Sequence, residues 1–314
     1  MMQSVVRAVC PVVSRMLLVL LGLLLSPVNA ASAATELDLL PTYRQGTFVW
    51  NKAGWDNFPN ILSELKWENL RIRGIKGILR HDMDRRSYLE ASGEYGWIYA
   101  GTVQDSDYDG DNRTEEYSRS NNSGNGGHVF DASLALGWKM RDTTSQRTSL
   151  LAGYGYSRQL LKMTDGFQTI DKDDPTRIGP FDRELNSSYR TVWQGPWLGL
   201  QHEEHLNKRL NLIARLEYHW LSYDAEARWN LRDDLEQPVT NNHWADGSGI
   251  VASLGLNYAA GSRWRLGAYV DYTTYSTGYG TDQVNVVDGT KIRIRLNEAR
   301  WDSWAYRLQA TYRF

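Results

Sequence analysis

In VQDSDYDGDNRTEE, residues 103–116, aspartates stand at every second position from 105 to 111, and two glutamates follow at 115 and 116. Their spacing matches the ligand positions of a twelve-residue calcium-binding loop, and Gly110 stands where such loops turn sharply. Carboxylate oxygens at this spacing can converge on one hard cation. The stretch therefore predicts a calcium site whose ligands are Asp105, Asp107, Asp109, Asp111 and Glu116.

Two features count against the calcium interpretation. The acidic run follows a predicted strand rather than a helix, and Asn112 stands where calcium loops usually carry an aliphatic residue. Exposed runs of Asp, Gly and Asn are also common loop material. A solvated acidic loop is therefore the alternative interpretation.

Apolar and polar residues alternate strictly in several segments, and this pattern predicts long strands. In WAYRLQATYRF, at the end of the chain, Trp304, Tyr306 and Leu308 share one face, whereas Arg307 and Gln309 share the other. A period of two residues places apolar side chains on one face of a sheet and polar ones on the other. Tyr and Trp gather near the strand ends on the apolar face, as in the aromatic girdles of membrane barrels.

The connections between these strands alternate in length. We predict ten strands, near residues 43–52, 60–81, 86–104, 127–141, 148–166, 187–204, 209–229, 246–260, 263–280 and 300–314. Short turns on one side, long loops on the other and an even strand number are typical of outer-membrane barrels. The predicted fold is all-β, a ten-stranded antiparallel transmembrane β-barrel over residues 34–314 with long extracellular loops and short periplasmic turns. The alternative is a soluble β protein.

Residues 1–33 have the layout of a secretory signal peptide. Arg7 and Arg15 precede the apolar run MLLVLLGLLL, and NAASA supplies small residues for cleavage. The apolar run is too short to span a bilayer as a helix, which disfavours a membrane anchor. The only cysteine, Cys10, lies here, so no disulfide is expected in residues 34–314. Loss of the two arginines would take the formal charge from −2 to −4, which does not favour a nucleic-acid partner.

One segment carries a family resemblance. LSELKWENLRIRGIKG, residues 62–77, resembles the second strand of the omptins, the ten-stranded outer-membrane proteases of Gram-negative bacteria. TVQDSDYDGD then falls where omptins carry an Asp-x-Asp pair, and TEEYSRS resembles the stretch that follows. The resemblance covers most of residues 34–314 in strand order. It implies an outer-membrane protein and, in an active member, an endopeptidase with Asp105 and Asp107 as one half of its catalytic site.

Omptins complete their site with an Asp–His pair, and this pair is missing at the expected place. Aligned from Trp220 without gaps, the expected Asp and His positions hold Ala227 and Trp229. A general base must hold a proton near neutral pH, and tryptophan cannot do this. His243, in NNHWAD on the same predicted loop, would be the substitute if that loop folds back over the mouth.

The sequence therefore favours a non-proteolytic omptin-like barrel whose external loops bind a ligand, with calcium as a candidate. The second interpretation is an omptin-type endopeptidase that uses Asp105, Asp107 and His243. The third is a narrow channel, although ten strands enclose a small lumen and its inward charges should pair and fill it. Expected partners are outer-membrane lipids, lipopolysaccharide and the barrel assembly machinery, which would read the terminal Phe314.

Overall fold

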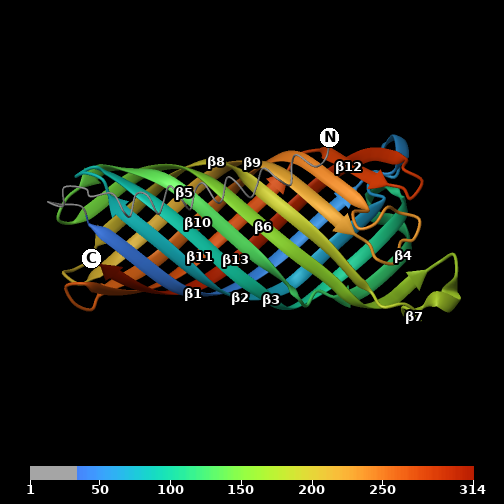
Figure 1. Cartoon of the computed structure of the whole chain (residues 1–314), viewed down its shortest axis with the longest axis horizontal. Helices are drawn as coiled ribbons and strands as arrows, with labels where there is room; N and C mark the ends of the chain where they lie inside the picture. The colour runs from blue at the N-terminus through green and yellow to red at the C-terminus, as the bar shows by residue number, and fades with distance from the viewer. Residues whose placement is uncertain (1–33) are drawn as a thin grey trace. The chain divides into compact units, whose positions relative to one another are not determined.

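The computed structural model describes residues 34–314, which form a closed β-barrel (Figure 1). The predicted signal peptide lies outside the described residues and stays a prediction. The three short 3-10 helices are η1 (Trp55–Asn57), η2 (Asp111–Arg113) and η3 (Pro175–Arg177). No helix in the described part of the chain has the length and apolarity needed to cross a membrane. The strands are β1 (Thr35–Lys52), β2 (Ser63–Asp82), β3 (Ser87–Gly110), β4 (Thr114–Ser123), β5 (Gly127–Asp142), β6 (Gln146–Asp171), β7 (Gly179–Pro180), β8 (Asn186–His205), β9 (Leu210–Arg228), β10 (Asn241–Ala259), β11 (Trp264–Thr277), β12 (Gly280–Asn285) and β13 (Lys291–Arg313).

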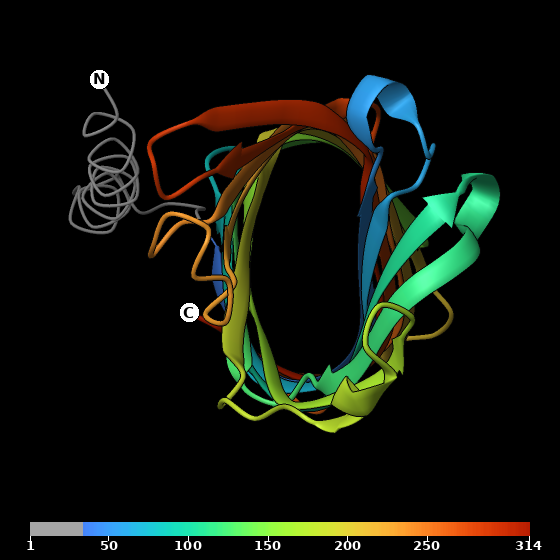
Figure 2. The ribbon, with the colours of Figure 1, turned by 90° about the vertical axis from the view of Figure 1, so that its right-hand side faces the viewer.

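Ten strand positions make up the ring, as predicted. Two of these positions are each shared by two successive strands. β4 and β5 together occupy the position between β3 and β6, and β11 and β12 together occupy the position between β10 and β13. Antiparallel pairing of β1 with β13 closes the ring, which is flattened in cross-section (Figure 2). The break between β4 and β5 needs glycine at residue 127, because its φ is +89° and a Cβ there would lie 2.0 Å from the Leu160 carbonyl oxygen.

The strands run further than predicted on one side of the barrel. Residues 105–126 were predicted as an external loop, and this prediction is wrong: β3 continues to Gly110, η2 makes the turn, and β4 returns. The predicted loop 281–299 is likewise mostly the hairpin of β12 and β13. The four predicted short turns are confirmed at the opposite end, which we call periplasmic from the usual barrel layout.

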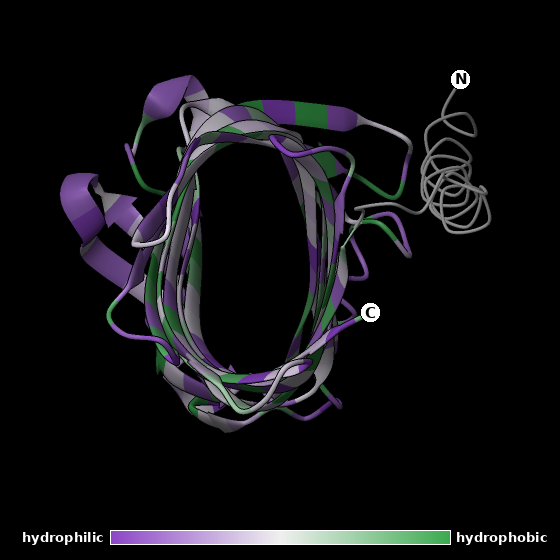
Figure 3. Cartoon of the chain, turned by 90° about the vertical axis from the view of Figure 1, so that its left-hand side faces the viewer, coloured by the Kyte–Doolittle hydropathy of each residue, from purple (hydrophilic) through white to green (hydrophobic). Residues whose placement is uncertain are grey.

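Alternation along the strands gives the barrel its two faces (Figure 3). On β13, Trp304, Tyr306 and Leu308 point outward and are 50%, 49% and 65% exposed, whereas Arg307 and Gln309 point inward and are buried. The outward apolar side chains face lipid in an outer-membrane barrel. The predicted amphipathic pattern is therefore confirmed, with the polar face in the lumen.

Charged side chains line the periplasmic half of the lumen, most of them as ion pairs. Arg215 contacts both Glu217 and Glu90 at 2.6 Å, and Glu217 also contacts His219 at 2.8 Å. Arg307 pairs with Asp271. Buried charges are tolerated when they are paired, so this network satisfies the prediction that inward charges neutralise one another.

Aromatic side chains fill the extracellular half of the lumen and meet across it. β1 and β8 lie on opposite sides of the ring, yet the rings of Phe48 and Tyr189 are 5.6 Å apart, and those of Trp50 and Tyr189 are 5.8 Å apart. Trp67 on β2 also contacts Tyr189, at 5.7 Å, and its indole N–H donates to the Lys162 carbonyl oxygen on β6. We call this buried cluster the aromatic plug; its aromatic members are Phe48, Trp50, Trp67, Tyr189, Trp193, Tyr223 and Trp301.

Candidate functional site: the extracellular cleft above the aromatic plug

The predicted acidic pair faces the lumen directly above the aromatic plug. Asp105 and Asp107 follow buried Val103 at two-residue intervals on β3, so all three side chains share the inward face. Cross-strand register puts Asp107 beside Ser63, and Ser63 beside Lys52. These residues belong to the extracellular part of the barrel, because lipid-exposed Trp97 lies well before them on β3. Asp105, Asp107 and Lys52 therefore lie side by side at the extracellular end of the lumen. We call this end of the lumen, above the aromatic plug, the cleft.

Both aspartates hold their protons more tightly than usual. Burial raises the pKa of Asp105 well above its ordinary value, and the neighbouring Asp107 carboxylate raises it further. Burial also raises the pKa of Asp107. Lys52 and Arg232 act in the opposite direction on both groups but do not outweigh burial. The pair thus has the electrostatics of two carboxyl groups that resist simultaneous ionisation.

His243 reaches the same cleft from β10, and there it forms an Asp–His pair. Its Nε2 lies 3.2 Å from Oδ1 of Asp282 on β12. Asn241 donates to the same carboxylate oxygen at 2.8 Å, and the Lys52 ammonium lies 2.9 Å from the other oxygen. Burial acts to raise the pKa of Asp282, but Lys52 and His243 outweigh it and hold this pKa well below its usual range. Lys52 therefore acts electrostatically on the Asp105–Asp107 pair and on the Asp–His pair together.

The other ring nitrogen of His243 is hydrogen-bonded. Nδ1 is hydrogen-bonded to the Tyr189 hydroxyl at 2.6 Å, and this hydroxyl is hydrogen-bonded to that of Tyr223 at 2.7 Å. His243 is 2% exposed and Asp282 is fully buried, and the Trp50 ring packs edge-on against the imidazole at 4.8 Å. A histidine that activates water needs one ring nitrogen directed at that water. In this arrangement Nδ1 is hydrogen-bonded, and Nε2, although it has no hydrogen bond, is buried facing Asp282, so neither nitrogen is directed at water.

The two positions that the resemblance aligns with the omptin Asp–His pair belong to the aromatic plug and its border here. Ala227 is buried within the plug. Trp229 stacks on Tyr189 with an interplanar angle of 6°, and its ring lies 6.5 Å from that of Trp50. These positions therefore pack the floor of the cleft and supply no acid or base.

The residues predicted to bind calcium are held apart by the β3–β4 hairpin. Asp109 is exposed, Asp111 accepts the Asn60 backbone N–H at 2.7 Å, and Glu116 on the returning strand forms a two-pronged ion pair with Arg119. On an extended strand, alternate residues are separated by roughly 6.6 Å, so their carboxylates do not wrap around one ion. Among residues 34–314, no three His, Cys, Asp or Glu side chains are grouped so that they could hold a metal ion.

Sequence reasoning missed four residues of this cleft: Lys52, Asp282, Tyr189 and Tyr223. Asp282 lies 39 residues after His243, in a segment predicted as loop, and only the pairing of β10 with β12 brings them together. Tyr189 and Tyr223 were read as ordinary strand residues. No local spacing links any of them to the acidic pair, so the sequence holds no signal that would have identified them.

The fold and the paired acidic groups define a ten-stranded outer-membrane barrel of omptin-like architecture. The chain is similar in structure to the outer membrane protease OmpT from Escherichia coli, with a TM-score of 0.74 and 15% identity over 92% of this chain and 99% of that one. Residues 39–314 match the family described as Pom, Protochlamydia outer membrane protein, and the chain belongs to that family.

Weaker structural matches are barrels of other kinds. The translocator domain of the autotransporter NalP from Neisseria meningitidis has a TM-score of 0.38 at 13% identity, with 88% of each chain covered. A FadL homologue from Pseudomonas aeruginosa has a TM-score of 0.31 at 12% identity, with 90% of each chain covered. No curated protein matches the sequence. The family and the fold together give the location, the bacterial outer membrane, where the barrel is surrounded by lipid.

Proposed function

We propose that this protein is a non-proteolytic omptin-like barrel whose extracellular cleft binds a ligand. The observation that carries the proposal is the state of His243: Nδ1 is hydrogen-bonded to Tyr189, Nε2 faces the Asp282 carboxylate at 3.2 Å, and the imidazole is buried away from water. Lys52 also lies beside Asp282 at 2.9 Å, so the carboxylate that would orient a catalytic histidine is already neutralised. The cleft therefore contains acidic groups of the kind a protease site uses, namely Asp105, Asp107 and Asp282, but no base that can contact water.

The aromatic plug supports binding rather than conduction. It gives the cleft a closed floor, because side chains from opposite strands touch across the lumen. Above this floor, Asp105 Oδ1 is buried and has no hydrogen-bond partner among residues 34–314. A buried carboxylate oxygen without a partner is costly, and a donor group on a ligand would satisfy it. A narrow channel, the third interpretation, would require this packed floor to open.

An omptin-type endopeptidase remains the second candidate, because one observation favours it. Asp282 and His243 do form an Asp–His pair, buried against the aromatic plug, and Asp105 and Asp107 face the same end of the lumen. Proteolysis would then require His243 to release Tyr189 and turn one nitrogen toward water. Because Nδ1 is hydrogen-bonded to Tyr189 and the ring is buried, this motion would break that hydrogen bond and expose the ring.

Peptide cleavage by the refolded barrel, with lipopolysaccharide present, separates these candidates. We expect no cleavage above the rate of the double variant Asp105→Ala/Asp107→Ala, with Asp109→Ala as a control that removes an exposed carboxylate of the same strand. Cleavage that is lost in the double variant but kept in the control would establish the protease instead. A heat-dependent shift in electrophoretic mobility would verify that each barrel is folded.

We further infer that the C-terminal strand is the contact for the barrel assembly machinery and that the outer wall contacts lipopolysaccharide. Phe314 supports the first inference, because it is 71% exposed and its ring packs edge-on against Tyr312 at 4.9 Å. Deletion of Phe314 should lower the yield of assembled barrel in cells while leaving refolding in detergent unchanged. Equal loss in both settings would indicate a purely structural role.

A further inference from the structure

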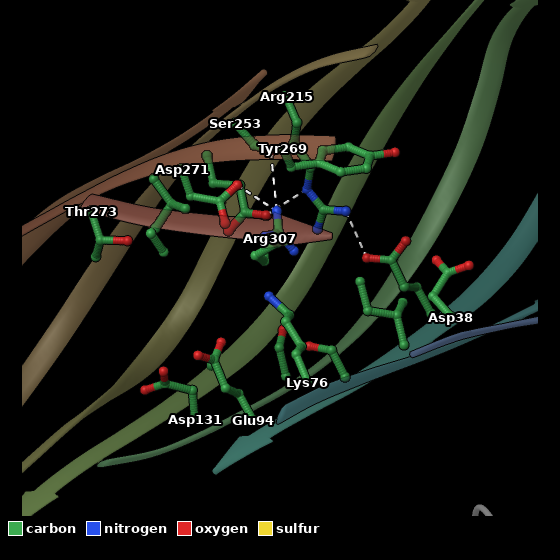
Figure 4. A pocket seen from close by; sticks show the side chains of 18 of the residues that line it. Asp38, Lys76, Glu94, Asp131, Arg215, Ser253, Tyr269, Asp271, Thr273 and Arg307 are labelled. Atoms are coloured by element: carbon green, nitrogen blue, oxygen red, sulfur yellow. Dashed lines mark hydrogen bonds and ion pairs between the residues drawn. The ribbon is translucent and has the colours of Figure 1, made fainter. Parts of the chain in front are cut away.

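A cavity lies below the aromatic plug, inside the periplasmic half of the lumen (Figure 4). Its volume is about 200 Å³. Trp193 and Trp301 line it at the underside of the plug, and Arg147 and Arg265 line it near the periplasmic ends of β6 and β11. The cavity therefore extends from the plug toward the periplasmic end and is separate from the extracellular cleft.

The carboxylates that line this cavity all have donors. Arg44 contacts Glu94 at 3.0 Å and Asp131 at 2.8 Å, and Arg307 pairs with Asp271. The remaining carboxylates are those of Asp38, Glu90, Glu203 and Glu217, whose donors include Thr311, Arg80, Asn211 and Arg215, respectively. The acidic groups of the wall therefore do not need a cationic ligand.

Lys76 is the exception among the cations that line the cavity. The other cationic side chains of the lining that are permanently charged each pair with a carboxylate; they are Arg44, Arg80, Arg147, Arg215, Arg265 and Arg307. The Lys76 ammonium forms no hydrogen bond and no ion pair within residues 34–314, and its nitrogen is not fully buried. An ammonium carries three N–H donors. The lining therefore presents a charged donor group that has no acceptor of its own.

The strand register explains why Lys76 has no protein partner. On β3 the residue opposite Lys76 is Glu94, and this carboxylate is held by Arg44 and by the Thr42 hydroxyl, which donates at 3.1 Å. On β1 the residue opposite is Leu40, which has no polar side-chain atom. The ammonium is therefore left facing the cavity.

Two guanidinium groups reinforce the positive field at this point. Arg307 and Arg44 are both charged neighbours of Lys76, and Figure 4 shows the ammonium directed into the cavity toward Arg307. Both arginines use Nη2 for their ion pairs. Within the described part of the chain, Nη1 of neither forms a hydrogen bond, and neither Nη1 is fully buried. The other charged neighbours, Glu94 and Asp271, are the carboxylates that these arginines already hold.

We propose that the cavity binds a small monovalent carboxylate, such as acetate, at Lys76. A ligand oxygen accepts from the Lys76 ammonium, and the ligand charge lies in the positive field of Arg307 and Arg44. A cavity of roughly 150 Å³ can hold benzene, so about 200 Å³ leaves room for a carboxylate with a short apolar chain. A single charge fits because Glu94 and Asp271 stay nearby and would repel a second one.

Protection of Lys76 from chemical modification tests this site. The refolded full barrel is methylated with formaldehyde and cyanoborohydride, and mass spectrometry follows Lys76 and Lys208 separately. Lys208 is exposed on a periplasmic turn and serves as the internal control. We expect acetate to slow methylation of Lys76 saturably, by about tenfold at ten times its Kd, and to leave Lys208 unchanged. Sodium chloride at the same ionic strength should protect neither lysine.

Two outcomes of this experiment would overturn the proposal. Methylation of Lys76 that acetate does not slow would remove the site. Equal slowing by chloride, or equal slowing at Lys208, would mean that dissolved ions screen the charge and that no carboxylate is bound.

Urea unfolding gives a second test that does not depend on access of the reagent. A ligand that binds only the folded barrel raises its unfolding midpoint, so acetate should raise the wild-type midpoint more than chloride does. Lys76→Met should abolish this rise without lowering the midpoint in the absence of acetate, because it removes a charge that has no partner. Lys76→Arg and the control Lys208→Met should both retain the rise. An acetate effect that persists in Lys76→Met, or that is absent from the wild type, would refute the assignment.

Discussion

Truncation of the aromatic plug tests the central structural claim, that the extracellular half of the lumen is packed solid. The change is Phe48→Ala and Tyr189→Ala, singly and together. Both side chains are fully buried, come from opposite strands, and lie 5.6 Å apart between ring centroids. They are therefore the pair whose removal should most directly reopen the lumen.

The expected losses differ for the two residues. Replacing a buried Phe by Ala costs about 3–5 kcal/mol of unfolding free energy, because transfer energy is lost and a cavity remains. Tyr189→Ala should cost more, since it also leaves His243 and Tyr223 without a hydrogen-bond partner, at about 1–3 kcal/mol for each unsatisfied group. The double variant should lose less than the sum, because residues in contact are not independent.

Two assays test whether the aromatic plug is tightly packed and closes the lumen. Guanidinium unfolding in lipid vesicles measures the stability losses, and single-channel recording measures conductance. We expect no measurable conductance from the wild-type barrel and a steady ion conductance from the double variant. Trp55→Ala is the control, because Trp55 is 69% exposed on a loop, and its loss should change stability by no more than about 0.5 kcal/mol.

Steady conductance by the wild-type barrel would refute the reasoning, since water and ions would then pass where the structure places packed rings. A loss of unfolding free energy below about 1 kcal/mol for Phe48→Ala would refute it independently, because removal of a ring from a well-packed core costs more than this. Either result would revive the narrow channel.

Four further predictions concern the cleft above the plug. Asp282→Asn should destabilise the barrel by about 3–5 kcal/mol in guanidinium unfolding, because it leaves the Lys52 charge unpaired, whereas Asp234→Asn on an exposed loop should change little. The depressed pKa of Asp282 means that this stabilisation is present above about pH 4 and is lost as the pH falls through the folded-state pKa, which a pH series of unfolding midpoints would reveal. Ionisation of Asp105 has the opposite effect on stability: because its pKa is raised in the folded state, its ionisation destabilises the fold. Asp105→Asn should therefore raise the unfolding midpoint at pH 8 and leave it nearly unchanged at pH 3. Calcium titration should give no saturable heat, and a saturable signal abolished by Asp107→Ala would restore the calcium site.

The barrel was predictable from the sequence because the residue pattern that specifies it lies within single strands. Alternation in residues 304–314 separates a lipid face from a lumen face with no knowledge of other strands, and the structure reproduces that separation. Short turns and ring size followed from the same pattern. The inward charges were also predictable as a set, although the partner of each, such as Glu90 for Arg215 across 125 residues, was not.

The cleft was only half predictable, because half of it depends on pairing between distant strands. Asp105 and Asp107 were visible through their spacing, but spacing alone could not distinguish a loop from a strand that continues beyond the membrane. That distinction decides the chemistry. A loop lets alternate carboxylates converge on an ion, whereas a strand fixes them in a row beside Ser63 and Lys52.

His243 shows why a catalytic residue type is weaker evidence than its hydrogen bonds. The sequence offered it as a replacement base, and the structure does bring it to an aspartate in the cleft. Yet the same fold buries the ring against Trp50 and assigns its remaining nitrogen to Tyr189, a plug residue that also contacts Phe48, Trp67 and Trp229. The aromatic plug and the Asp–His pair are therefore one packed unit. A mutation that frees His243 for catalysis must loosen the floor of the cleft, so gain of proteolysis and loss of lumen closure should appear together.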